Sequence, residues 1–221
     1  MSHAPRPNAD RLYTEAEYLA LEEASWAKPA REKHEYVDGR IHAMAGGSTN
    51  HNLVAFNLTR EIAVQLRRRP CRGYMSTTRV KTPPPAAYFY PDLTALCGNP
   101  EYEGAGVETL LNPTTVVEVL SKSTAGFDRG KKFHHYRRLP SLQESLLFAQ
   151  DRVFVEMRVR AGDVWTPSLY TGLDDVIVLP SIDCTLRLRD VYEGVEFPAA
   201  PPAPPRLIRE EPADGYAATP S

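Results

Sequence analysis

The chain has 221 residues, of which 42% are hydrophobic and 24% are charged, which is the composition of an ordinary globular protein and excludes a wholly disordered chain. At roughly 150 residues per domain, this length favours one domain with tails over two domains. The formal net charge of -2 excludes a global basic excess, so any surface for nucleic acid has to be local.

The N-terminal region is expected to form a short helix and then a β-hairpin. Thr14 and Glu17 have the spacing of a capping box, which opens a helix. Two strand-like segments, residues 33–37 and 40–44, then flank Asp38-Gly39. This dipeptide suits the positive φ angles of a tight turn, so we expect a hairpin here.

The middle of the chain predicts a long helix followed by strands. Apolar residues recur at helical spacing from Leu53 to Leu66, ahead of a proline. β-branched and aromatic residues then return in three segments, residues 74–81, 88–97 and 115–120. We expect these segments to be successive strands of one sheet.

A second helix is predicted from Asp128 to Leu139, where Pro140 ends it. Residues 145–149 and 153–160 predict a strand pair, and strand-like segments continue to about Val195. The proline-rich and alanine-rich residues beyond cannot bury enough apolar surface to offset ordering entropy. We therefore expect one domain over residues 11–197, between a disordered N-terminus, 1–10, and a disordered tail, 198–221.

The cysteines and the absence of targeting signals predict an intracellular protein. Cys71, Cys97 and Cys184 are odd in number and too far apart for a Cys-x-x-Cys motif, so we expect buried free thiols in a reducing compartment. Residues 1–10 lack the apolar stretch of a signal peptide. No segment approaches the roughly 20 apolar residues of a membrane span, so a cytoplasmic location without a membrane anchor is expected.

Two acidic residues, Asp92 and Glu118, lie inside apolar, strand-like segments. An acid in such a segment is costly to bury unless it is paired or bound to a metal. Hydrolysis of a phosphodiester uses a metal ion that lowers the pKa of the attacking water, and Mg²⁺ takes one or two protein carboxylates. The structural alternative is that Asp92 ends a strand and that Glu118 forms a buried pair with a basic residue.

Asp128, Lys132 and Tyr136 fall four residues apart and therefore share one face of the predicted second helix. A lysine on that face could direct its ammonium group toward the two acids. The alternative is an ordinary Asp128–Lys132 ion pair on a solvated face of the helix.

These motifs, taken in order, match those of a known family. They are Tyr90-Pro91-Asp92, then Val117-Glu118-Val119-Leu120-Ser121-x-Ser123-Thr124, then Asp128-x-x-x-Lys132-x-x-x-Tyr136. With the early blocks at residues 34–40 and 44–51, they resemble the Uma-type restriction endonucleases of the PD-(D/E)xK nuclease superfamily. The resemblance covers residues 12–197.

The resemblance implies an α/β (α+β) fold, with a restriction-endonuclease-like core in which helices flank a mixed β-sheet. It implies a Mg²⁺-dependent endonuclease that hydrolyses DNA phosphodiester bonds, with Mn²⁺ able to substitute. Asp92, Glu118 and Glu35 are implied as metal ligands. Lys132 is implied to orient or help deprotonate the attacking water or to stabilise the phosphate, and His51 to support the site or contact the phosphate.

The sequence departs from the superfamily's pattern at the position of the catalytic lysine. The usual lysine, two residues after the second acid, is replaced by Leu120, which is why Lys132 on the helix is the expected cation. Lys122 stands where the family has proline, and strand alternation would place it on the face of Glu118. Lys122 is thus an alternative cation, unless it is a loop lysine in solvent, and Asp128 is expected to support the site together with Tyr136.

Basic residues near the predicted site favour DNA as a partner. One cluster follows the predicted long helix and consists of Arg67, Arg68, Arg69 and Arg72. The alternative explanation for this cluster is that the helix dipole favours cations at a helix C-terminus. Phosphate contacts of this kind supply affinity without reading sequence. The other cluster adjoins the predicted site and has six basic residues and one acidic residue, Asp128. Its basic residues are Lys122, Arg129, Lys131, Lys132, Arg137 and Arg138.

Two functions of different classes stay open. The first is the endonuclease, and the second is a non-catalytic nucleic-acid-binding or assembly module that retains the nuclease fold. The presence of every charged site residue favours the enzyme, because a decayed module has no reason to keep costly acids in strands. Cleavage of RNA or of branched DNA shares the same site. A homodimer or higher homo-oligomer would help an enzyme that makes two cuts across a duplex.

Overall fold

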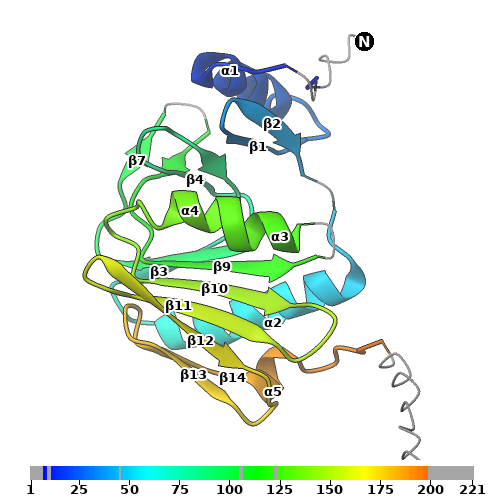
Figure 1. Ribbon diagram of the computed structural model, residues 1–221, viewed down its shortest axis with the longest axis vertical. Coiled ribbons are helices and arrows are strands. Elements are labelled where there is room, and N and C mark those ends of the chain that lie inside the picture. The colour runs from blue at the N-terminus through cyan, green and yellow to red at the C-terminus, as the bar shows by residue number, and fades with distance from the viewer. Residues whose placement is uncertain (1–6, 9–10, 45, 105–106, 122–123, 199–221) are drawn as a thin grey trace, which may run out of the picture.

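The computed structural model describes residues 7–8, 11–44, 46–104, 107–121 and 124–198. Two six-stranded sheets and a separate two-stranded hairpin form its scaffold, and helices cover both faces of the second sheet (Figure 1). Both predicted tails lie largely outside the described residues. No helix of the described part of the chain combines the length and apolar character needed to cross a bilayer.

The first sheet is mixed and includes the predicted hairpin. Asp38 and Gly39 have φ angles of 51° and 75°, as the tight turn requires, so the hairpin is confirmed. The β4 and β8 strands pair in parallel, and the other pairs are antiparallel. The spatial order is β2 (Arg40–Ala43), β1 (His34–Val37), β5 (Tyr88–Phe89), β4 (Arg79–Lys81), β8 (Thr109–Leu110) and β7 (Tyr102–Glu103).

The second sheet carries the main core. Its β9 and β10 strands run parallel, and its other pairs are antiparallel. Along β9, Val117 and Val119 face one core while Val116 faces another, as the alternation of a strand dictates. The spatial order is β12 (Val164–Tyr170), β11 (Val155–Ala161), β10 (Glu144–Ala149), β9 (Thr115–Leu120), β6 (Leu93–Cys97) and β3 (Cys71–Met75).

Helix α1 (Glu15–Trp26) covers the first sheet. Its capping box is confirmed, because the Glu17 N–H donates to Thr14 Oγ1 at 3.2 Å and the Thr14 N–H donates to Glu17 Oε2 at 2.8 Å. Tyr18 is fully buried and its ring lies 5.1 Å from that of Tyr36. This aromatic packing fixes the helix over β1.

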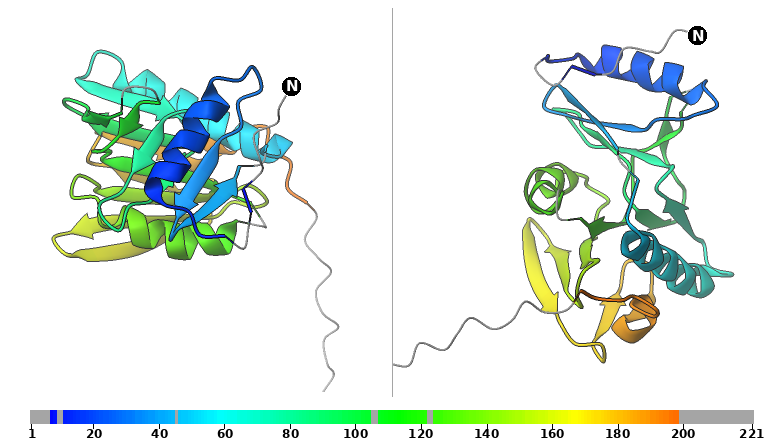
Figure 2. Two further views of the ribbon diagram at one scale, coloured as in Figure 1. Left: turned by 90° about the horizontal axis from the view of Figure 1, so that it is seen from above. Right: turned by 90° about the vertical axis from the view of Figure 1, so that its right-hand side faces the viewer.

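The predicted long helix is confirmed as α2 (Thr49–Leu66), which begins after the Ser48 cap. It lies along the second sheet on the side away from α1 (Figure 2). Its apolar stripe, Val54, Leu58 and Ile62, is buried in the same core as the hairpin formed by β13 (Val176–Leu179) and β14 (Cys184–Arg187) and the short α5 (Leu188–Val191).

The expectation that three segments form successive strands of one sheet is wrong. The segment 74–81 turns at residues 76–78 and passes from β3 in the second sheet to β4 in the first. The segment 88–97 breaks at Pro91, between β5 and β6, because proline has no N–H for a strand ladder. Each of these two segments therefore crosses between the sheets once, and Asp92 lies at the crossing in the second segment.

The second helix begins earlier and ends sooner than predicted. It consists of α3 (Ala125–Phe127), a π-helical turn, η1 (Asp128–Lys132), and α4 (Phe133–Tyr136). The Phe133 N–H donates to the Asp128 carbonyl oxygen, five residues back. Such π-turns occur mostly as single insertions in helices, often at functional sites.

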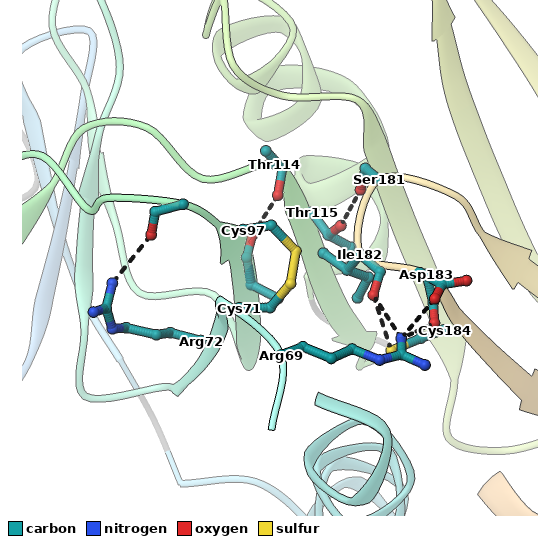
Figure 3. The surroundings of a disulfide bond; sticks show 12 residues. Arg69, Cys71, Arg72, Cys97, Thr114, Thr115, Ser181, Ile182, Asp183 and Cys184 are labelled. Atoms are coloured by element: carbon teal, nitrogen blue, oxygen red, sulfur yellow. Dashed lines mark hydrogen bonds and ion pairs between the residues drawn. A yellow bond between two sulfur atoms is a disulfide. The ribbon is translucent and has the colours of Figure 1, made fainter. Parts of the chain in front are cut away.

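The prediction of three free thiols is wrong, because Cys71 and Cys97 form a disulfide (Figure 3). These residues stand opposite each other where β3 pairs with β6, a proximity that their separation of 26 residues does not indicate. Cys184 is a buried free thiol, as expected. Two basic residues of the Arg67–Arg72 cluster bind the protein beside the bond: Arg72 Nη1 donates to the Gly98 carbonyl oxygen at 3.1 Å, and Arg69 Nη1 lies 3.1 Å from Asp183 Oδ2.

Candidate active site

The two strand acids lie opposite each other on the second sheet. Leu93 of β6 pairs with Val117 of β9, so Asp92, just before β6, faces Glu118 across the ladder. The Val119 N–H donates to Asp92 Oδ2 at 2.7 Å, which fixes the aspartate side chain against β9. Glu118 is buried, with 5% of its surface exposed.

Lys132 lies at the centre of this group of acids. Its Nζ is 2.9 Å from Glu35 Oε1, 2.9 Å from Glu118 Oε1 and 3.5 Å from Asp128 Oδ1. The four side chains are at most 8% exposed, and the Phe89 ring centroid lies 5.7 Å from Nζ. The Asp128–Lys132 pair therefore exists, but it is buried and shared with two strand acids and does not lie on a solvated face.

Further hydrogen bonds orient the glutamates. The Tyr136 hydroxyl donates to Glu118 Oε1 at 2.8 Å, so the helical face that carries Lys132 also holds this carboxylate. The Tyr90 N–H donates to Glu35 Oε1 at 3.3 Å. In both glutamates, these contacts with described residues are made by Oε1.

Glu35, Asp92, Glu118, Asp128 and Lys132 are called the acid cluster below. Burial raises the pKa of Glu118 well above its ordinary value, and the charges of Asp128 and Asp92 add to this rise while Lys132 opposes it. Burial lowers the pKa of Lys132, but the attraction of Glu118 and Glu35 outweighs it, so the lysine pKa is raised. Lys132 is therefore an ammonium ion among acids that outnumber it, and the cluster favours a further cation.

His51, in the first turn of α2, contacts Asp92 of the acid cluster. Its Nε2 lies 3.3 Å from Asp92 Oδ2, and the hydrogen bond with Asp92 raises the histidine pKa. Its Nδ1 is buried and has no partner among the described residues. The Ser48 cap, which accepts a hydrogen bond from the His51 N–H at 3.1 Å, holds this turn in place.

Lys33 is a neighbour of the site that sequence reasoning missed. Its Nζ donates to the Ser76 carbonyl oxygen at 2.8 Å and lies 5.7 Å from the Tyr90 ring centroid. Burial lowers the pKa of Lys33, against the attraction of Asp92 and Glu35. The available signal was its place two residues before Glu35, because alternate residues of an extended segment share a face.

Comparison with known proteins gives the family. Residues 15–189 match the family model Uma2, described as "Putative restriction endonuclease". The chain belongs to the Uma2 family. The Uma2 chain is 38% identical to the uncharacterized protein sll1609 of Synechocystis sp. over 153 residues, which cover 69% of this chain and 84% of that protein. It is 32% identical to the uncharacterized protein slr1290 of the same organism over 197 residues, which cover 89% and 100%.

A solved structure shares the fold of the Uma2 chain. It is the crystal structure of a putative nuclease belonging to DUF820 from Anabaena variabilis, with a TM-score of 0.65 and 17% sequence identity, covering 80% of this chain and 96% of that chain. At this identity the likeness concerns the fold alone. The predicted family and the predicted fold, mixed sheets flanked by helices after an N-terminal helix and hairpin, are both confirmed.

The basic cluster predicted between Lys122 and Arg138 is largely engaged with the Uma2 chain itself. Lys122, the alternative cation, lies outside the described residues. Lys132 is buried in the acid cluster, whereas Arg137 is exposed. The other members contact protein groups: Arg129 Nε and Glu156 Oε2 at 3.2 Å, Lys131 Nζ and Asp38 Oδ2 at 3.1 Å, and Arg138 Nη2 and the Pro83 carbonyl oxygen at 3.0 Å.

The donor set of the acid cluster fits a magnesium ion through two carboxylates. Among the described residues, no group of three His, Cys, Asp or Glu side chains is placed to hold a metal ion, and Lys132 Nζ lies between Glu35 and Glu118. Mg²⁺ needs only one or two carboxylates and keeps several waters. Asp92 and Glu118, which face each other across the ladder, meet that requirement.

Proposed function

We propose that this Uma2 chain is a metal-dependent endonuclease that hydrolyses phosphodiester bonds of DNA. The observation that carries the proposal is the Lys132 ammonium held 2.9 Å from both Glu35 and Glu118, with Asp92 facing Glu118. Burying so many ionised groups costs several kcal/mol for each ion, and perturbed buried acids beside a cation are typical of catalytic sites. The description of the Uma2 family supports the same activity.

Asp92 and Glu118 would hold the metal, Mg²⁺ or Mn²⁺. When bound, such an ion screens the phosphate charge and lowers the pKa of a water molecule. Asp92 uses Oδ2 for its contacts with Val119 and His51, so Oδ1 is the natural donor to the ion. Glu35, implied as a third ligand, contacts Lys132 and would receive a hydrogen bond from a water at the ion.

Lys132 supplies the positive charge of the protein. Because its pKa is raised, it stays protonated and can donate to a phosphate oxygen or orient the attacking water. In a site with little solvent, such a fixed charge acts more strongly than it would in water. Tyr136 keeps Glu118 in place, and His51 does the same for Asp92, so both carboxylates are set before the substrate arrives.

Nicking of supercoiled plasmid in Mg²⁺ tests the proposal. Wild type should nick, while Asp92→Ala and Glu118→Ala should each lose at least about a hundredfold in rate, as is common when charge stabilisation is removed from an active site. Glu144→Gln is the matched control, since Glu144 is a buried strand acid that binds Thr115 Oγ1 away from the acid cluster. Equal rates in all four proteins would remove the acid cluster from the chemistry.

The second candidate is a non-catalytic nucleic-acid-binding or assembly module with the nuclease fold. One observation favours it, namely that Lys132 already pairs with both Glu35 and Glu118. This candidate predicts no nicking with any divalent metal. It also predicts DNA binding that Asp92→Ala leaves unchanged.

A further inference from the structure

A hollow lies between the end of α1, the turn from β3 to β4, and the β7–β8 segment. Its volume is about 360 Å³, which is within the range of roughly 300–1,000 Å³ that accommodates small organic ligands. Three aromatic side chains line it: Trp26 at the end of α1, Tyr74 of β3 and Tyr102 of β7. We call this hollow the aromatic pocket.

The aromatic pocket adjoins the acid cluster through the turn from β3 to β4. Met75 pairs with Leu93 at the end of the β3–β6 ladder, so the next residue, Ser76, lies beside Asp92. Lys33 Nζ donates to the Ser76 carbonyl oxygen at 2.8 Å, which ties the turn to the strand that carries Glu35. The two residues after Ser76, Thr77 and Thr78, are already part of the pocket wall.

The chemistry of the aromatic pocket suits a flat, polar-edged ring. The Arg31 guanidinium lies 5.2 Å from the Trp26 ring centroid, and the Tyr102 hydroxyl donates to the Tyr74 hydroxyl at 2.8 Å. Trp26 Nε1 is buried and interacts with the Tyr90 side chain, so Trp26 offers a ligand the face of its ring and not its N–H.

The charges in the wall argue against a phosphate as the occupant. Arg31 and Glu108 both line the pocket, so its acid offsets its base. A nucleobase has no charge, a π-face that stacks on aromatic rings, and an edge of donors and acceptors. Threonine hydroxyls and the Glu108 carboxylate can bind such an edge.

Hydrogen bonds from Arg79 hold the pocket wall that contains Val107. Arg79 is 4% exposed, and its Nη2 donates to the Val107 carbonyl oxygen at 3.1 Å while its Nε donates to Thr109 Oγ1 at 2.9 Å. Val107 lines the pocket. A wall fixed in this way needs little reorganisation on binding, as is usual for ligand sites.

We infer that the aromatic pocket receives an unpaired nucleobase of the DNA strand whose phosphate lies at the acid cluster. This inference rests on the proposed function for the placement of that strand. A base in a fully paired duplex is not free to enter, so the pocket favours single-stranded, bulged or distorted DNA over intact duplex. It would make the chain a nuclease for unpaired positions.

The test uses Trp26 as a fluorescent reporter. The chain has two tryptophans, so Trp165→Phe leaves Trp26 alone. Three duplexes of one sequence are titrated without divalent metal: fully paired, carrying one unpaired central nucleotide, and carrying the same extra nucleotide without its base. We expect the unpaired nucleotide to quench Trp26 and to tighten binding about tenfold over the paired duplex, and the abasic duplex to do neither.

Variants separate stacking from a folding effect. Trp26→Phe retains a flat ring and should retain the preference for the unpaired base, read by affinity. Trp26→Leu and Tyr102→Ala should lose most of it, and Tyr102, which is 40% exposed, can be truncated without opening the core. Equal affinity for the unpaired and abasic duplexes, or an unchanged preference in both of these variants, would overturn the inference.

Failure of the inference about the aromatic pocket can be distinguished from failure of the proposed function. Binding is read without metal and nicking is read on plasmid. If the wild type nicks but does not distinguish the abasic duplex, the aromatic pocket fails alone. If base-dependent quenching occurs and no metal supports nicking, the endonuclease proposal fails and the pocket stays a DNA-binding site.

Discussion

Lys132 determines how its acidic neighbours tolerate burial. Removing its charge by Lys132→Met would leave Glu35, Glu118 and Asp128 buried without their cation. Breaking a buried pair in this way costs about 3–5 kcal/mol, so the free energy of unfolding in urea should fall by that amount at neutral pH. Lys131→Met, at the exposed neighbour, should change it by less than about 1 kcal/mol. Similar losses in both variants would mean that Lys132 is not the structural centre of the cluster.

Glu118 should make stability depend on pH. Its pKa is raised in the folded chain, first by burial, so folding takes up a proton between the unfolded pKa of about 4.3 and the higher native pKa. The contribution of Glu118 to the free energy of unfolding is therefore present at low pH and is lost as the pH rises through that interval. Asp128, whose pKa burial also raises, adds to the same slope.

Thermal unfolding between pH 4 and pH 9 measures this effect. Glu118→Gln cannot titrate at that position, so its melting temperature should fall less steeply with rising pH than that of the wild type. Identical slopes would show that Glu118 ionises as easily in the fold as in the unfolded chain.

Single elements were predicted well where their signals are local. The capping box at Thr14, the Asp38-Gly39 turn and the stripe of α2 each depend on residues within a few positions. The division of residues 74–81 between two sheets depends on pairing with strands far along the chain, which no local pattern contains. Pro91 is a local signal for the break before Asp92, but residues 88–97 were predicted to form one continuous strand in spite of this proline.

The π-helical turn η1 offers a test at the scale of the element. Gly130 lies in this turn, and a Cβ there would meet no atom within 4 Å, so Gly130→Ala should stabilise the chain by about 0.5–1 kcal/mol. Gly39→Ala is the contrasting variant, because its φ of 75° disfavours a side chain and Leu12 Cδ2 lies 3.3 Å from the new Cβ. It should destabilise the chain in the same denaturation experiment, and a loss of stability in Gly130→Ala would show that η1 requires glycine.

At the scale of the whole molecule, the acid cluster lies where separate parts of the fold meet. Glu35 comes from the first sheet, Asp92 and Glu118 from the second, and Lys132 from the helical segment that lies over it (Figure 1). The apolar segments around Asp92 and Glu118 predicted these two acids, because an acid within an apolar strand is costly to bury, whereas Glu35 was implied only by the family resemblance. It could not predict Lys33 or the aromatic pocket, whose parts adjoin only after the chain has crossed between the sheets.

Isothermal titration of Mn²⁺ and of Mg²⁺ into the wild type, the Asp92→Ala/Glu118→Ala double variant and the Glu144→Gln control tests the central claim most directly. The wild type and the control should bind with one site per chain, more tightly at pH 8 than at pH 6 because Glu118 must release its proton, and the double variant should give no heat of binding. A wild type that binds neither ion, or a double variant that binds both as the wild type does, would contradict a metal-dependent site at Asp92 and Glu118.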